Sequence, residues 1–476
     1  MTPVNLDAYH LMHEGTLALS RAEQNGLRID VEYLSKQAGK QQARIDALAK
    51  GLDQYPETAE WRQWCRLTRK KFNPMSADQL ATVLFDVLQK QPINHTDSGA
   101  PSADDETLKA MKMPLCADIL SMRKLDKVVG TYIGGILREQ TNGWLHPSFG
   151  LTQVRTFRGQ SEDPNFQNIP VRDPEQGTVI RKSIYPRLGH RLGEDDFKGS
   201  EVCVAACYTR DPKLIEYVTN PKLDMHRDMG GEVFILDTIK NATWWTDKKG
   251  GKPVRQATKG DFVFASFYGS YWFQTALALW RDIEEYKLTA PGGVPMKEHL
   301  ADQGIKELGR VDEKTGKPTR GSFFAHVRDV EDRFWGQRFK VYAQWRKDVV
   351  TDYYKRGYMD SLTGFRYSGP MSRNGISNYM IQGSSFHCLL WCFIQEDRWL
   401  RKNKMDTRLV GQIHDSKLKD YHPDEVSTIV KESQRLVLED LRQHWPWIVV
   451  PMVVEFEISG VDESWNEKKA YKEVAA

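Results

Sequence analysis

Two aspartates that lie far apart in the chain have the residue type and the setting for metal-assisted chemistry. Asp415 follows an apolar, strand-like run in "QIHDSKLKDY", and Asp196 ends a polar turn in "RLGEDDFKGSEV", just before an apolar helix. Each also has an ordinary interpretation, because aspartate is common at hairpin turns and at helix N-termini. Glu201 favours the functional interpretation, since a plain amphipathic helix would not require an acid five residues after Asp196.

Two carboxylates on rigid strand ends could hold two divalent metal ions about 3.5–4 Å apart, an arrangement that suits phosphoryl transfer. One ion would lower the pKa of an attacking hydroxyl, and the other would neutralise the triphosphate and the leaving group. Mg²⁺ fits carboxylate and phosphate oxygens better than zinc does. Spacing alone is a weak argument for this pair, because a large protein contains many aspartates.

A third segment, "RQATKGDFVFASFYGS", could bind a nucleoside triphosphate. It places Arg255 and Lys259 one helical turn apart, and Phe264 and Tyr268 one turn apart. Two cations that we expect to have no acid against them could clamp a triphosphate, and two aromatic rings on one stripe suit a base and a sugar edge. Alone, the segment is equally typical of a helix with a basic solvent side and an aromatic core side.

The pattern of the chain predicts a sheet that collects these acids from distant strands. The first third is mostly helical, short extended runs begin at Leu145, and a long helical stretch runs from about Pro212 to Tyr358. The last third combines a helix, the hairpin around Asp415 and a final strand, "VVPMVVEFEI". Strands on both sides of a helical insertion indicate one sheet with helices standing out from it.

Composition describes an ordinary globular protein. The 476 residues are 40% hydrophobic and 28% charged, with a formal net charge of +3 that neither requires nor excludes a nucleic-acid partner. The longest apolar stretches are too short to cross a bilayer and the N-terminus does not resemble a signal peptide, so we expect a cytoplasmic protein. The six cysteines lack zinc-site spacing and are predicted to be buried free thiols.

Taken together, these segments resemble the polymerase region of the family A DNA polymerases. "DFKGSE" is similar to the family's first catalytic motif, "RQATKGDFVFASFYG" to its fingers motif and "QIHDS" to its second catalytic motif. Further similar segments follow in the family's order: "AEQNGLRID", "TFRGQSEDPNFQNIP", "DMHRDMGGEVF" and "NYMIQGSS". The resemblance covers nearly the whole chain.

The resemblance implies an α+β, right-hand fold with an antiparallel-sheet palm, helical fingers and a helical thumb. The implied division is palm base 1–38, thumb 39–145, first part of the palm 146–213, fingers 214–358 and second part of the palm 359–476. The implied activity is template-directed DNA synthesis. Its substrates are primer–template DNA and deoxynucleoside triphosphates, and its cofactor is two Mg²⁺ ions, with Mn²⁺ as a substitute.

The resemblance also implies roles for individual residues. Asp196, Asp415 and Phe197 correspond to metal-binding positions, and the distance to Glu201 selects Asp196 over the alternative, Asp195. Glu201 corresponds to a steric gate with Tyr268 against a 2′-hydroxyl. The remaining positions fall into three groups: triphosphate and sugar contacts (Arg255, Lys259, His226, Phe264), the primer terminus and minor groove (Arg158, Asn378, Gln382, His414), and thumb contacts to phosphates (Arg123, Lys124, Lys127). We expect Lys259 to act also as the proton donor to pyrophosphate.

The chain departs from the family pattern at several positions. Ser416 replaces a Glu, Phe157 replaces a Gly, and Phe386 and His387 replace Ala-Asp. The fingers motif also carries one extra residue between Lys259 and Tyr268, which would rotate the cations by about 100° in an unmodified helix. We therefore predict a π-bulge near Gly260, or alternatively a helix that begins only after Lys259.

The polymerase-like match begins within the first few dozen residues, so we expect no proofreading exonuclease in this chain. A separate exonuclease or processivity factor is a possible partner, no membrane is expected, and we expect a monomer. The unusual fingers motif looks phage-like, which implies viral DNA replication in a host cytoplasm. Two alternatives are a single-subunit RNA polymerase, disfavoured by Glu201 with Tyr268, and a non-catalytic DNA-binding scaffold, disfavoured by the intact acids and cations.

Overall fold

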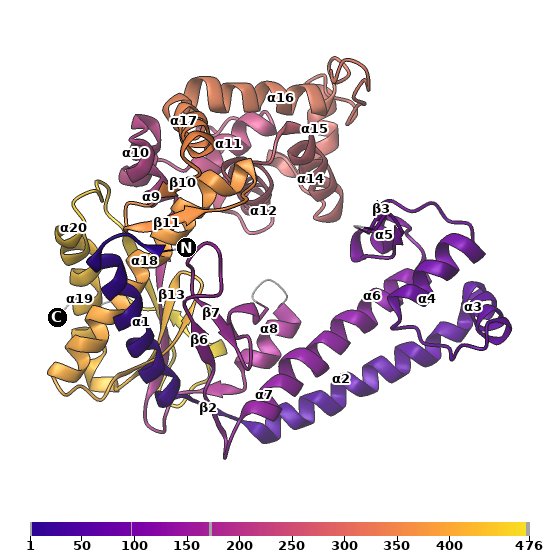
Figure 1. Ribbon diagram of the computed structural model, residues 1–476. Coiled ribbons are helices and arrows are strands. Elements are labelled where there is room, and N and C mark those ends of the chain that lie inside the picture. The colour runs from indigo at the N-terminus through magenta and orange to yellow at the C-terminus, as the bar shows by residue number, and fades with distance from the viewer. Residues whose placement is uncertain (1, 97, 171–173, 473–476) are drawn as a thin grey trace.

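A five-stranded antiparallel sheet forms the centre of the molecule (Figure 1). The computed structural model describes residues 2–96, 98–170 and 174–472. The sheet has the order β12-β13-β9-β14-β15, with bounds Arg408–Ile413, Ser416–Tyr421, Arg191–Lys198, Val453–Ile458 and Lys469–Ala470. Strands that are more than two hundred residues apart in sequence thus become neighbours.

Helices cover one face of this sheet because its strands alternate in polarity. In β14 every second residue is buried, and the buried set packs with the helices α19 and α18. Helix α1 lies against β12 and α18. The bounds of the covering helices are Leu6–Asn25 for α1, Arg373–Lys402 for α18, Val426–Arg435 for α19 and Leu441–His444 for α20, with a π-helical turn at Leu436–Asp440.

Three small sheets surround the central one, and a fourth lies at the tip of the arm described below. The order β5-β2-β8 joins Trp144–Leu145, Leu27–Ile29 and Ile184–Tyr185, and β6 (Ser148–Gly150) pairs with β7 (Gln160–Glu162). The order β1-β11-β10 joins Thr2–Pro3, Phe365–Ser368 and Tyr358–Asp360, and the short pair is β3 (Asn94–His95) with β4 (Pro101–Ser102). The single-turn helix Phe166–Asn168 and α8 (Pro174–Arg181) complete this region.

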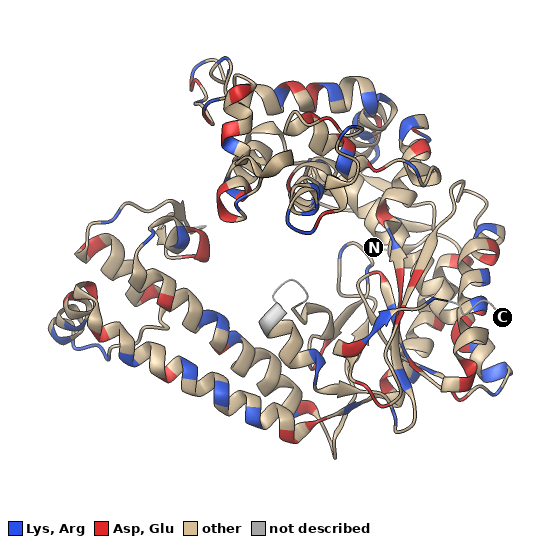
Figure 2. Cartoon of the chain, turned by 180° about the vertical axis from the view of Figure 1, so that it is seen from behind, with Lys and Arg blue, Asp and Glu red and all other residues tan. Residues whose placement is uncertain are grey.

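Two long helices form an arm that leaves the sheet, and Figure 2 shows Lys and Arg positions spaced along it. They are α2 (Val31–Gly51) and α6 (Pro114–Asp126), the latter continued by a π-helical stretch at Lys127–Ile133 and by α7 (Gly134–Glu139). The tip contains α3 (Pro56–Leu67), α4 (Ala77–Thr82), α5 (Asp105–Ala110) and turns at Leu52–Gln54 and Val83–Val87. Buried apolar side chains such as Trp61, Leu84 and Ile119 give this arm its own core.

A helical subdomain stands on the other side of the opening. After α9 (Ser200–Thr209), it contains α10 (Pro212–Thr219), α11 (Met225–Val233), α12 (Gly251–Ala257), α13 (Ala265–Tyr268), α14 (Trp272–Glu285), α15 (Met296–Asp302), α16 (Phe323–Arg333) and α17 (Lys340–Arg356). Short turns lie at Trp244–Thr246, Pro291–Gly293 and Phe334–Arg338. Its aromatic core includes Phe262, Phe334 and Phe339, which are almost fully buried.

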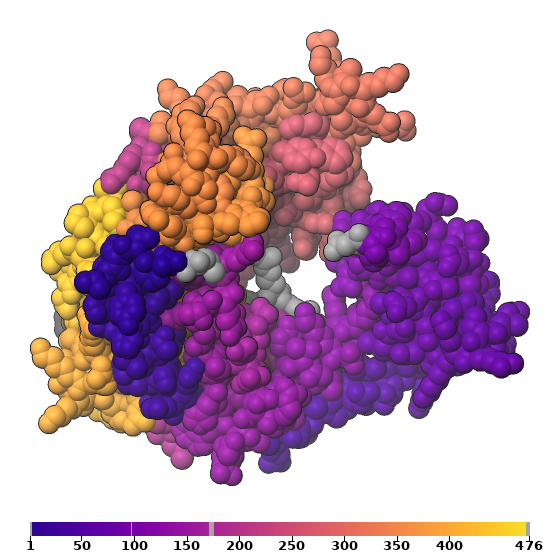
Figure 3. Space-filling model, in the orientation of Figure 1, coloured from indigo at the N-terminus to yellow at the C-terminus, as the bar shows by residue number. Residues whose placement is uncertain are grey.

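The tip of the arm touches this helical subdomain. Lys109 Nζ of α5 lies 3.9 Å from Glu285 Oε1 of α14, and Glu106 Oε1 of α5 lies 3.8 Å from Arg281 Nη1 of α14. The space-filling view shows an opening bounded by the sheet region, the arm and the helical subdomain (Figure 3). The two ion pairs have opposite polarity, so each side contributes one cation and one anion.

The observed architecture confirms the predicted α+β class with an antiparallel sheet and two helical projections. The expected boundary at residue 39 falls inside α2, because that helix runs without a break from the sheet region into the arm. All six cysteines are buried and free, as predicted. Among the described residues, no helix has the length and apolar character needed to cross a membrane.

Candidate active site

The sheet brings the two predicted acids together. Asp196 lies near the end of β9, and Asp415 occupies the turn between β12 and β13. Ser416, the first residue of β13, pairs with Asp196, and the Phe197 amide donates a 2.9 Å hydrogen bond to the Asp415 carbonyl. The positions implied for metal binding therefore lie on adjacent backbone segments, although more than two hundred residues separate them in sequence.

Strand alternation separates Asp196 from Asp195. The Asp195 side chain is fully buried on the helix-covered face, where it accepts a 2.7 Å hydrogen bond from the Tyr421 hydroxyl and contacts Lys419. Successive side chains of a strand point to opposite faces, so Asp196 faces away from those helices. Asp195 is thus committed to a buried ion cluster, and Asp196 is the acid that remains accessible beside Asp415.

The pKa of Asp196 indicates that negative charge exceeds positive charge around this side chain. Although the side chain keeps an exposed edge, partial burial and then the negative charge of Asp415 raise its pKa from 3.8 to about 6. Arg158 supplies some compensation, with Nη2 3.9 Å from Asp415 Oδ1. A bound cation would relieve the remaining repulsion between the two carboxylates.

Replacing Asp196 by Asn should therefore stabilise the metal-free protein at neutral pH. A carboxyl group whose pKa is higher in the folded state than in the unfolded state lowers the stability of the folded protein once it ionises. That loss develops as the pH rises from about 4 through about 6. The expected gain for Asp196→Asn at pH 7.5 is on the order of 1 kcal/mol after solvent screening, and it should vanish near pH 4. Thermal unfolding in a chelator at both pH values measures it, and a less stable variant at pH 7.5 would contradict it.

Glu201 and Tyr268 close one side of a pocket next to these acids. The Tyr268 hydroxyl donates to the Glu201 carboxylate, and Arg158 Nη1 donates to the other carboxylate oxygen at 3.3 Å. Burial raises the pKa of Glu201, and burial together with Glu201 raises the pKa of Tyr268. The pocket is lined by Glu201, Val202, Ala205, Phe264, Phe267, Tyr268, Tyr342, Asn378, Ile381 and Gln382.

The helix that carries the predicted triphosphate contacts contains the predicted π-bulge. The helix α12 passes into a π-helical segment at Thr258–Phe264 and then into α13, so a regular helix is excluded. The wider turn absorbs the extra residue near Gly260. Phe264 and Tyr268 therefore face the pocket, and Lys259 Nζ lies 5.3 Å from the centre of the Phe264 ring.

The expectation that these two cations have no acid nearby is wrong, as the surroundings of Arg255 show. Its Nε donates a 2.6 Å hydrogen bond to Asp224, an acid that also caps α11. The pairing fixes the direction of the guanidinium while leaving its other nitrogens available to an anion.

His226 lies between this ion pair and the aromatic stripe. Its ring is 5.6 Å from that of Phe264 in an edge-on arrangement. Burial, followed by the charge of Arg255, lowers the pKa of His226 to about 4, so the ring is neutral at pH 7. Its buried Nδ1 has no hydrogen-bond partner within the described part of the chain, which is the condition expected of a group that meets a ligand.

Deleting Gly260 should leave most of the activity intact. Gly260 lies in the π-helical segment, where a Cβ would meet nothing within 4 Å, and its loss would convert that segment into a regular helix without rotating either flank. Deleting Gln256 instead should move Arg255 or Lys259 by about 100° around the helix. Single-nucleotide incorporation should stay within about threefold of the parent for the first deletion and fall by about 100-fold for the second. Equal losses would contradict this account.

The residues expected at the primer terminus gather beside the same pocket. Asn378 Nδ2 donates to the Tyr268 carbonyl at 2.9 Å, and Gln382 lines the pocket one helical turn further along α18. His414 adopts the left-handed backbone region (φ 49°) in the turn next to Asp415, and burial lowers its pKa. Gln412 donates to the His414 carbonyl, a contact that the sequence did not indicate.

The three thumb residues differ in their surroundings. Lys124 and Lys127 are exposed on α6 and the stretch that follows it. Arg123 points inward, since its Nη1 donates to the Ala103 carbonyl at 2.9 Å and its Nη2 is buried. The Arg123 guanidinium thus makes a contact within the arm, and its contact with phosphates stays a prediction.

Three of the departures from the family pattern, Phe157, Phe386 and His387, lie close to one another. Phe157 has a left-handed backbone (φ 57°), and its ring packs 4.8 Å from that of Phe365 and 6.3 Å from that of His387. A Cβ on Gly159 would lie 2.7 Å from the Phe386 ring. Ser416 is buried and donates to the Ile413 carbonyl at 2.9 Å. The replacements thus fill space behind Arg158 and leave the acids and the pocket in place.

The donor set fits a hard divalent cation. Two carboxylates and the main-chain carbonyl of Phe197 offer oxygen ligands only, and Mg²⁺ usually takes its other ligands from water and substrate phosphates. Among the described residues, no group of three or more His, Cys, Asp or Glu side chains is placed to hold a metal ion. A metal held here would therefore depend on its substrate for ligands, as the raised pKa of Asp196 also suggests.

Comparison with known proteins identifies relatives that align with nearly the whole chain. The chain is 26% identical to DNA polymerase I of Caldicellulosiruptor bescii, across 95% of this chain and 46% of that protein. It is 28% identical to the thermostable DNA polymerase I of Thermus filiformis, across 95% of this chain and 47% of that one. The chain spans about half the length of these curated relatives.

A solved structure confirms the right-hand fold. The polymerase domain of Pol1 from M. smegmatis, in complex with DNA primer-template and dNTP, superposes with a TM-score of 0.72 at 21% identity, across 96% of this chain and 70% of that one. The sequence profile described as DNA polymerase family A matches residues 42–284, just over half of the 476 residues. The chain therefore belongs to DNA polymerase family A.

Proposed function

We propose that this protein is a DNA-directed DNA polymerase that extends a primer 3′-hydroxyl with deoxynucleoside triphosphates. The observation that carries the proposal is the junction of two features: Asp196 and Asp415 lie on adjacent segments of the sheet, and the Glu201–Tyr268 pocket opens beside them. An oxygen-only metal site next to a pocket with an aromatic wall and two cations suits a nucleotide and its phosphates.

In the proposed mechanism, the chain mainly positions its substrates. Lys124 and Lys127 contact backbone phosphates of the duplex without reading its sequence. Arg255, oriented by Asp224, and Lys259 bind the triphosphate, and closure of their helix would carry it to the acids. Lys259 Nζ then donates a proton to the departing pyrophosphate.

Asp196, Asp415 and the Phe197 carbonyl would hold two Mg²⁺ ions, which when bound would lower the pKa of the primer hydroxyl and neutralise charge on the phosphates. Glu201 and Tyr268 would occupy the space beside the sugar, where a 2′-hydroxyl would have to fit. This contact favours a DNA polymerase over a single-subunit RNA polymerase. Phe264 would lie against the sugar of the incoming nucleotide.

Primer extension with Mg²⁺ tests the proposal directly. We expect extension on both a short gap and a long single-stranded template, with deoxynucleotides strongly preferred. Absence of synthesis combined with DNA binding would instead support a non-catalytic scaffold, and equal use of ribonucleotides would support an RNA polymerase.

We also propose a replicative, viral role. The support is the unusual fingers motif with its π-helical segment. Long products from a single binding event are the expected result. Synthesis confined to short gaps would favour repair.

A further inference from the structure

A fully buried cluster of four charged side chains lies behind the candidate active site. Lys417 Nζ is 2.5 Å from Glu396 Oε2 and 3.4 Å from Asp195 Oδ2, and Lys419 Nζ contacts both acids. The exposed fraction of all four side chains is 0%. Two cations thus balance two anions in the interior, where an isolated charge would be very costly.

The cluster connects the elements that carry the active-site residues. Asp195 is on β9, Lys417 and Lys419 are on β13, and Glu396 is on α18. The Ser433 hydroxyl of α19 donates to Glu396 at 2.5 Å. Helix α18 also carries Asn378 and Gln382, so one network links three elements that carry or adjoin site residues: β9, β13 and α18.

Register places the cluster directly beneath the two acids. Lys417 pairs with Asp195, and the next pair along the ladder is Ser416 with Asp196. Asp415 immediately precedes that pair. A shift of β13 against β9 would therefore break the ion pairs and change the distance between Asp196 and Asp415 in the same movement.

We propose that this cluster is a positioning device: Asp195 and Lys419 fix β9 against β13 and so set the separation of Asp196 and Asp415. The inference rests on the proposed metal-dependent function. Apolar residues could fill the same volume with equal stability, but their contacts do not specify one register, whereas hydrogen-bonded ion pairs do. Asp195 and Lys419 are positioning residues, since neither touches a substrate.

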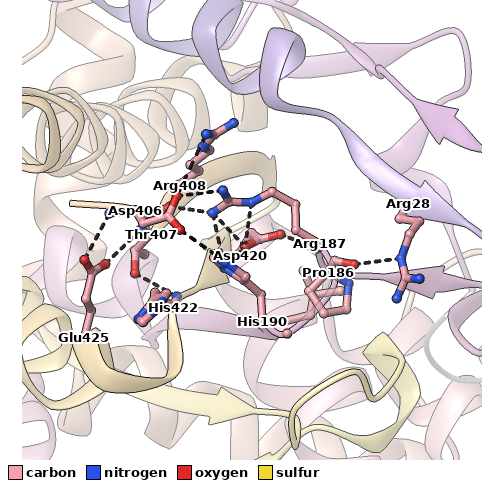
Figure 4. Close-up of polar contacts among 12 residues, drawn as sticks. Arg28, Pro186, Arg187, His190, Asp406, Thr407, Arg408, Asp420, His422 and Glu425 are labelled. Carbon is pink, nitrogen blue, oxygen red and sulfur yellow. Dashed lines mark hydrogen bonds and ion pairs between the residues drawn. The ribbon is translucent and has the colours of Figure 1, made fainter. Parts of the chain in front are cut away.

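A second polar network, at the other end of β9 and β13, serves as a control for the proposed positioning role. There Asp420 accepts from the Arg187 amide at 2.6 Å, and its Oδ1 lies 2.7 Å from His190 Nδ1 (Figure 4). Asp420 pairs with Leu192, four residues along the ladder from Asp196. This network also joins β9 to β13, but on the opposite face and away from the acids.

The test compares paired replacements in the two networks. Lys419→Met alone leaves an uncompensated buried acid and should lower both the melting temperature and the rate of nucleotide incorporation. Asp195→Asn with Lys419→Met should regain most of the melting temperature. The kcat of this double variant should stay about tenfold or more below that of the parent, with little change in KM for nucleotide. Its affinity for Mn²⁺ should fall about fivefold, as measured by electron paramagnetic resonance without nucleotide.

The control variant, Asp420→Asn with His190→Gln, should lower the melting temperature while kcat and Mn²⁺ affinity stay within about twofold. Tyr421→Phe, which removes the hydroxyl that donates to Asp195 without changing charge, should weaken Mn²⁺ binding at a nearly unchanged melting temperature. Recovery of kcat and Mn²⁺ affinity together with stability in the paired variant, or equal losses in the control, would overturn the positioning role. Failure of the parent to extend a primer would instead refute the proposed function, and the Mn²⁺ measurement would still decide the role of the cluster.

Discussion

Asp415→Ala is expected to abolish primer extension while primer–template binding remains. The side chain lies in the turn beside Asp196, so its removal takes away half of the carboxylate pair that the sheet places next to the pocket. We expect incorporation to fall by at least about 10³-fold, which corresponds to about 4 kcal/mol of lost transition-state stabilisation. Single-turnover incorporation with Mg²⁺, combined with a fluorescence assay of duplex binding, measures both quantities.

Asp424→Ala is a matched control for that substitution. Asp424 is an exposed acid in the turn Pro423–Glu425, directly after β13, so the same residue type is lost close to the same strand. It should extend primers at the parent rate. Equal extension by Asp415→Ala and the parent would remove the catalytic role from the carboxylate pair, and loss of duplex binding would point to a folding defect.

Glu201→Ala is expected to weaken the preference for deoxynucleotides over ribonucleotides by about 100-fold, or about 2.7 kcal/mol. In the parent, Glu201 accepts from the Tyr268 hydroxyl and from Arg158, which fixes a carboxylate at the side of the pocket. Truncation to Ala removes that obstacle and frees space for a 2′-hydroxyl. The ratio of kcat/KM for the two nucleotide types on one DNA template provides the measurement.

Two further substitutions complete this test: one removes only the hydrogen bond, and the other is a surface control. Tyr268→Phe keeps the ring and removes the hydroxyl, so most of the discrimination should remain. Glu216→Ala removes an acid that pairs with Lys213 on the surface of α10 and should change nothing. Unchanged sugar preference in Glu201→Ala would show that another part of the pocket excludes ribonucleotides.

The choice between Asp195 and Asp196 shows how far the sequence could lead. Motif spacing selected Asp196, and the structure gives the reason, because alternation along β9 directs Asp195 into the helix-covered core. The π-helical segment was predictable for a similar reason: one extra residue in a helix must be absorbed or must rotate one flank. Local periodicity decides both cases.

Contacts between distant segments could not be predicted in this way. Lys417 and Lys419 alternate along β13 as solvent-facing lysines would, but acids from β9 and α18 make their burial possible. Arg255 seemed free of acids because Asp224 is more than thirty residues away in sequence, and the contact of Arg123 with the Ala103 carbonyl was not indicated because the two are twenty residues apart. Each outcome depends on tertiary neighbours rather than on residue type.

The two ion pairs between α5 and α14 join the tip of the arm to the helical subdomain, so the protein forms a closed ring around the opening. A linear duplex can be threaded through such a ring from an end, but a covalently closed circle can be captured only while both pairs are separated. Exposed ion pairs contribute at most about 1 kcal/mol each, so this contact would open readily and would weaken as the salt concentration rises. If the opening holds duplex DNA, as the proposed function requires, capture and release of the duplex would both depend on opening the contact between α5 and α14.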